Sequence, residues 1–72
     1  MNSPETKEII GTVVDILHGY GLVHMKCDND SVFGLSQDTP GVELKNVKPG
    51  QKYRCIVAQP FFRVLRAELI ED

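Results

Sequence analysis

Apolar and polar positions divide the chain into five short apolar segments separated by turn-forming residues. The segments are rich in β-branched and aromatic residues, and this composition predicts β-strands. Leucine, alanine and glutamate in the last segment would also suit a helix, but its aromatic and valine residues and the short Gln59-Pro60 link favour a strand. The segments are EIIGTVVDIL at 8–17, YGLVHMKC at 20–27, SVFGLS at 31–36, QKYRCIVAQ at 51–59 and FFRVLRAELI at 61–70.

Two of the segments alternate in a way that separates an inner from an outer face. In the second segment Leu22 and His24 fall on one face, and Val23 and Met25 fall on the other. This period of two predicts strands with one face on a core. The fourth segment sets Tyr53, Cys55 and Val57 against Lys52 and Arg54.

Glycine and proline residues mark the predicted bends, turns and connections between the strands. Gly11 predicts a bend or bulge in the first strand, and the glycines around Tyr20 predict either a sharply bent strand or a cleared surface beside an aromatic ring. Residues 28–30 (DND) read as a turn. The stretch 37–50 is one long connection with two Pro-Gly turn signals, and its apolar residues would form a single helical turn or an irregular loop.

Five short strands with one long connection between the third and the fourth predict an all-β fold. At 72 residues a two-sheet sandwich would be cramped, so we expect a small five-stranded antiparallel Greek-key barrel of the OB type. Residues 1–7 are polar and predict a flexible N-terminal leader, with the domain at 8–72.

The size leaves little interior for a deep catalytic cavity and favours a surface function. Apolar residues make up 42% of the chain and charged residues 25%, as in soluble globular proteins. No apolar run is long enough for a membrane span or a signal peptide. Two cysteines, Cys27 and Cys55, lack the spacing of a zinc site, and we expect a reducing, cytoplasmic environment.

Charge and motifs narrow the function further. The formal net charge of −2 argues against strong non-specific binding to duplex DNA but leaves room for stacking-driven binding to single strands. No nucleophile, base and orienting group stand at recognisable spacing, and neither histidine has a metal-ligand partner nearby. We therefore expect a non-enzymatic protein without metal or cofactor.

From Gly11 to about Ile70 the chain resembles the bacterial cold-shock domains. The resemblance lies in Gly11-Thr12-Val13, in His18-Gly19-Tyr20-Gly21-Leu22-Val23 for the central basic-Gly-Phe-Gly-Phe-Ile motif, and in Ser31-Val32-Phe33-Gly34-Leu35 for Asp-Val-Phe-Val-His. It continues in Pro49-Gly50-Gln51-Lys52-Tyr53 and Arg66-Ala67-Glu68-Leu69. In that family the central motifs lie on adjacent strands, and their aromatic rings stack unpaired bases.

Carried over position by position, the resemblance implies a reduced aromatic platform for weak binding of single-stranded RNA or DNA. Tyr20 and Phe33 would stack bases, with His18 and Lys26 flanking the strand and Arg63 within reach of a phosphate. The chain departs from the family at three ring positions. Leu22 replaces a phenylalanine, Leu35 a histidine and Asp15 a tryptophan.

Two alternatives stay open at this point. The alternation of residues 31–36 leaves either Phe33 or Val32 inside, so Phe33 would equally serve as a core residue. The missing aromatics and the acidic balance also fit an OB-fold protein-interaction or regulatory module that has lost nucleic-acid binding. In either case we expect a monomer rather than a dimer.

Overall fold

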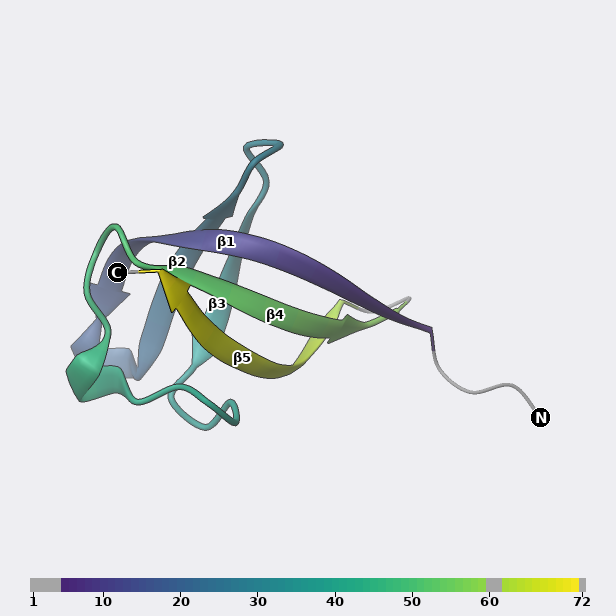
Figure 1. Cartoon of the computed structure of the whole chain (residues 1–72). Coiled ribbons are helices and arrows are strands. Elements are labelled where there is room, and N and C mark those ends of the chain that lie inside the picture. The colour runs from purple at the N-terminus through teal and green to yellow at the C-terminus, as the bar shows by residue number, and fades with distance from the viewer. Residues whose placement is uncertain (1–4, 60–61, 72) are drawn as a thin grey trace.

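The computed structural model describes residues 5–59 and 62–71, which form one five-stranded antiparallel sheet (Figure 1). Neighbouring strands follow the order β3-β2-β1-β4-β5. Short 3₁₀ turns lie at His18–Tyr20 and Leu44–Asn46. The strands are β1 (Thr6–Leu17), β2 (Leu22–Cys27), β3 (Val32–Ser36), β4 (Lys52–Ala58) and β5 (Arg63–Glu71).

The strand order is that of a Greek key. β1, β2 and β3 follow one another, and β4 returns through the long connection to lie beside β1. This confirms the predicted all-β, five-stranded antiparallel fold, which fits a small OB-type barrel. The sheet is not closed, because β3 and β5 lie at its two ends.

Two contacts hold the open side of the sheet, which we call the seam. The rings of Phe33 and Phe62 meet edge to face with centroids 5.6 Å apart. Elsewhere along β5, the backbone N–H of Ala67 donates to the carbonyl of Pro40 at 2.9 Å. The segment after β3 therefore covers the middle of the β5 edge, which would otherwise expose unpaired backbone groups.

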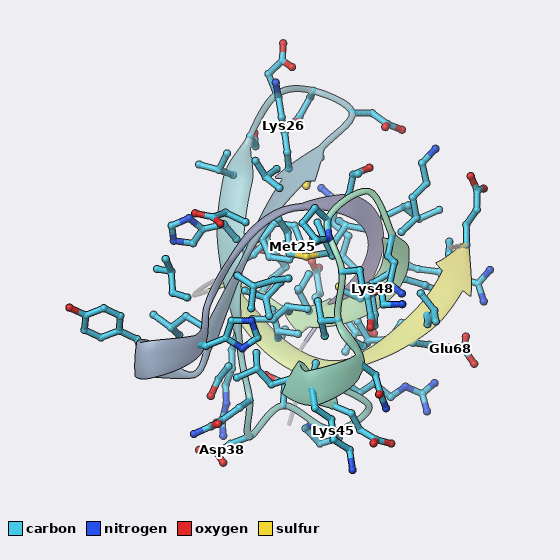
Figure 2. All side chains as sticks on the ribbon, turned by 90° about the vertical axis from the view of Figure 1, so that its left-hand side faces the viewer. Met25, Lys26, Asp38, Lys45, Lys48 and Glu68 are labelled. Atoms are coloured by element: carbon cyan, nitrogen blue, oxygen red, sulfur yellow. The ribbon has the colours of Figure 1, made fainter. Side chains whose placement is uncertain are left out.

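The core lies on the concave face of the sheet. Met25 is fully buried at its centre, whereas the neighbouring Lys26 lies toward the end of the β2–β3 hairpin (Figure 2). The alternation predicted for β2 and β4 is confirmed, since one face of each strand is buried. The buried apolar residues of the strands are Val13, Val23, Met25, Leu35, Tyr53, Cys55, Val57 and Ala67.

The first strand differs from its prediction in two ways. It begins at Thr6, so Thr6 and Lys7, which the sequence assigns to the leader, pair with β4. Its bulge lies between Val13 and Asp15 and not at Gly11. Gly11 instead makes room for the Phe33 ring, because a Cβ there would stand only 3.0 Å from two of the ring carbons.

The long connection contains the single helical turn that was one of the two predicted options. The turn Leu44–Asn46 lies between Val42 and Val47, which are both buried. The connection ends at Gln51, a buried polar side chain whose Oε1 accepts the N–H of Lys48 at 2.8 Å. The hydrogen bond satisfies this buried oxygen, as buried polar groups require.

The helical segments within the described ranges are single turns, and none is long and apolar enough to span a bilayer.

Candidate nucleic-acid interface

Tyr20 is the most exposed of the large hydrophobic residues that the structure describes, at 80%. The sequence predicts Tyr20 at the start of a strand. In the structure it lies at the end of the 3₁₀ turn between β1 and β2. Gly21 closes that turn in the left-handed conformation (φ +66°) and starts β2 at Leu22. The sequence prediction missed the turn because a glycine pair reads equally well as a bent strand.

The backbone of this turn is held in place although the ring is free. The N–H of Gly21 donates to the carbonyl of His18 at 3.3 Å, and the carbonyl of Gly21 accepts the N–H of Gln37 at 2.8 Å. The Gln37 side chain packs so closely that a Cβ at Gly21 would come within 2.6 Å of it. Tyr20 therefore extends from an anchored support, a favourable arrangement for a stacking ring.

A shallow groove of about 590 Å³ runs over the outer face of β1, β2 and β3. Its apolar residues include Val14, Leu22 and Val32, which are 54%, 38% and 73% exposed. Val14 follows the buried Val13 and lies on the outer face of β1, at the bulge. Gly34 has no side chain, and this keeps the centre of the groove flat. A Cβ at this position would project into open space, with its nearest neighbour 3.8 Å away.

The polar groups of the groove lie on β2 and on the turn that follows it. His24 lies opposite Gly34 in register, and Lys26 follows two residues later on the same face. The ammonium group of Lys26 forms an ion pair with Asp30 at 3.4 Å. Lys26 lies four residues after Leu22, about 13 Å along β2. Tyr20 lies in the turn just before that strand, so the exposed ring and Lys26 lie toward opposite ends of β2.

Phe33 lines the groove from the core side of β3, whereas Tyr20 is not one of its lining residues. It lies opposite Met25 in register, on the core face of β3, and it is only partly exposed. Its ring packs over Gly11 and against Phe62, at the margin of the hydrophobic core. Of the two neighbours, Phe33 is therefore the inward residue and Val32 the outward one, at 73% exposed; stacking of a base on Phe33 stays a prediction.

The other residues that the resemblance implies, His18, Lys26 and Arg63, do not lie on one surface. His18 is exposed in the same turn as Tyr20. Arg63 begins β5 and lines a different hollow, with Asp38 and Pro40, so it does not share the groove with Lys26. Phe61, the first residue of the predicted fifth strand, lies outside the described residues.

Sequence reasoning missed several residues of the groove. The predicted alternation already placed Leu22 and His24 on one face, and that signal extended to β3 would have selected Val32 and Gly34. Val14 lies on the outer face of β1 beside the buried Val13, but in a run of apolar or β-branched residues the alternation that would select it is weak.

Within residues 5–59 and 62–71, no cluster of three or more His, Cys, Asp or Glu side chains has a metal-binding arrangement. Both cysteines are free. Burial raises the pKa of the Cys55 thiol to about 11, with a smaller contribution from Cys27. Burial and the nearby Asp28 also raise the pKa of Cys27, against an opposing effect of Lys7.

The high pKa of Cys55 predicts a loss of stability in alkali. Its thiol ionises near pH 9 in the unfolded chain but near pH 11 in the fold, so its contribution is complete below about pH 9 and is lost as the pH rises to about 11. The expected loss in unfolding free energy is on the order of 2 kcal/mol. Urea titrations from pH 8 to pH 11 measure it, and Cys55→Ala should show a shallower decline; parallel curves for the two proteins would contradict this account.

Comparisons with protein-family models, with curated proteins and with solved structures gave no match to this chain.

Proposed function

We propose that the protein binds single-stranded RNA or DNA weakly, along the groove over β1, β2 and β3. The observation that carries this proposal is the Tyr20 ring, 80% exposed on an anchored turn that leads into β2, one of the three strands under the groove. Every nucleobase offers a π-face, and stacking on one aromatic ring contributes about 1–3 kcal/mol per base. The OB-type fold supports the same proposal, because open barrel faces of this kind bind oligonucleotides.

The groove suits bases better than it suits a phosphate backbone. Its floor is aliphatic and flat at Gly34, so further bases would lie on Val14, Leu22 and Val32 without the gain of ring stacking. Lys26 carries the only full positive charge among the described residues that line it. Few phosphates are neutralised, so the binding is weak and depends little on salt.

Replacing Tyr20 with alanine is expected to weaken binding of a short pyrimidine-rich oligonucleotide at least about fivefold, since one stacking contact is lost. Tyr20→Phe keeps the ring and should bind as the wild type does. Both variants should retain the melting temperature, because the side chain contributes little to the core. Fluorescence anisotropy with a labelled oligonucleotide measures the affinities.

Equal binding by wild type and Tyr20→Ala would remove Tyr20 from the site, and an absence of binding by all three proteins would overturn the proposal. Chemical-shift mapping adds a spatial test, since shifts should cluster on β2 and on the turn that carries Tyr20. Shifts confined to β4 and β5 would place the ligand on a different surface.

A protein-interaction module is the second candidate, and the aliphatic character of the same groove favours it. Val14, Leu22 and Val32 are exposed, and exposed apolar patches often mark protein contacts. A complex formed through them would survive nuclease treatment and would be lost in Leu22→Ser, whereas oligonucleotides would cause no shifts. A complex that disappears with nuclease would exclude this candidate.

A further inference from the structure

The Lys26–Asp30 ion pair lies where the groove ends at the β2–β3 turn. The two side chains approach to 3.4 Å, and both are solvent-exposed, at 52% and 84%. Both residues line the groove. The charge best placed to attract a phosphate is therefore already partnered by a carboxylate of the same chain.

The backbone of the turn does not require an aspartate at position 30. Asp30 has a positive φ of +68°, a conformation that glycine and asparagine adopt at least as readily. Its N–H donates to the carbonyl of Cys27 at 3.0 Å, a bond that any residue other than proline would make. The side chain of Asn29, and not that of Asp30, accepts the N–H of Ser31. The backbone conformation and hydrogen bonds of the turn therefore do not depend on the Asp30 carboxylate.

We propose that Asp30 attenuates nucleic-acid binding by competing with the ligand's phosphate for Lys26; this inference rests on the proposed function. Binding of a phosphate to the Lys26 ammonium requires the ion pair with Asp30 to open. The free energy of the ion pair is therefore lost when the phosphate contact forms, and the net gain from that contact is smaller. Asp30 keeps the affinity low and limits the number of ions released on binding.

Asp30→Asn tests the proposal, because it removes the charge and suits the positive φ. We expect about two- to fivefold tighter binding of the oligonucleotide at low salt, the range of an exposed ion pair. Freeing Lys26 for one more phosphate should also steepen the plot of log affinity against log salt concentration by about 0.7. The gain should shrink as salt is raised.

Asp28→Asn is the matched control. It changes the net charge by the same amount in the same turn, but Asp28 lines the hollow beside Lys7 and Phe62 and not the groove. Its affinity and salt slope should stay close to those of the wild type. In a Lys26→Gln background, Asp30→Asn should produce no gain, since nothing is left to be released.

The outcomes separate this inference from the proposed function. Wild-type binding with equal affinities for Asp30→Asn and Asp28→Asn would overturn the role of Asp30 and leave the proposed function standing. A gain that persists in the Lys26→Gln background would also overturn it, because the effect would then be simple repulsion. If neither wild type nor Asp30→Asn binds, both proposals fail.

Discussion

Replacing Gly41 with alanine is expected to lower the free energy of unfolding by about 3 kcal/mol or more, a large part of the stability of a domain this small. Gly41 has a positive φ of +92°, and a Cβ there would lie 1.8 Å from the carbonyl oxygen of Ala67. The chain would have to withdraw from β5, which breaks the hydrogen bond between Ala67 and Pro40. The contact that holds one part of the seam would be lost.

Gly50→Ala separates the steric effect from the backbone effect. Gly50 has nearly the same φ, +93°, but a Cβ there would meet nothing within 4 Å. Its cost should be only that of the left-handed conformation, about 1–2 kcal/mol. Urea denaturation of both variants measures the difference; equal losses would mean that the contact between Gly41 and β5 does not constrain the fold.

Leu35→Ala is expected to cost about 2–5 kcal/mol, the second large effect on stability. Leu35 is 1% exposed and lies in β3 opposite Val23, which is fully buried. The substitution removes buried methyl groups and leaves a cavity that an end strand of the sheet can fill only in part. Thermal and urea unfolding give the change in free energy.

Val32→Ala provides the control within the same short strand. Val32 lies on the opposite face and is 73% exposed, so its truncation should change stability by less than about 0.5 kcal/mol. It should slightly weaken oligonucleotide binding if the groove is the site. Comparable destabilisation by both substitutions would contradict the assignment of the inner and outer faces of β3.

The fold could be predicted from the sequence because several independent signals agree. Alternation separated the two faces of β2 and of β4, and in each strand one of those faces is buried. The short turns and the single long connection limited the topology to few options. One of them is the Greek key, in which β1 pairs with β4, and the structure has this pairing. The seam could not be predicted, since it depends on contacts between residues far apart in the chain, such as Pro40 and Ala67.

The candidate site was predicted only in part, because the sequence does not fix which residues of β3 face outward. Phe33 and Val32 are neighbours, and a shift of one position exchanges the inner and outer faces of a strand. Pairing of Phe33 with Met25 settles this in favour of the core. Tyr20 was correctly predicted as exposed, but its support is a 3₁₀ turn and not a strand, because Gly21 adopts a left-handed conformation.

Glycine had two different roles that composition alone does not separate. Gly21 permits a backbone conformation, whereas Gly11 leaves space for an aromatic ring on the neighbouring side of the core. Both glycines also face a side chain remote in sequence, Gln37 at Gly21 and Phe33 at Gly11. Local sequence patterns therefore indicate where a glycine matters but not which property of glycine the fold uses.

Among the described strands, β1 alone pairs with members of both halves of the sheet, β2 on one side and β4 on the other. The β2–β3 hairpin is thus hydrogen-bonded to the rest of the sheet through β1, and Phe33 adds a ring contact with Phe62 across the seam. The turn at the tip of the hairpin extends away from β5 (Figure 1). Exposed loop tips of this kind tolerate insertions and exchanges. Residues 28–31 are thus a natural place for grafting recognition loops, because ligand preference could diversify there without disturbing the opposite half of the domain.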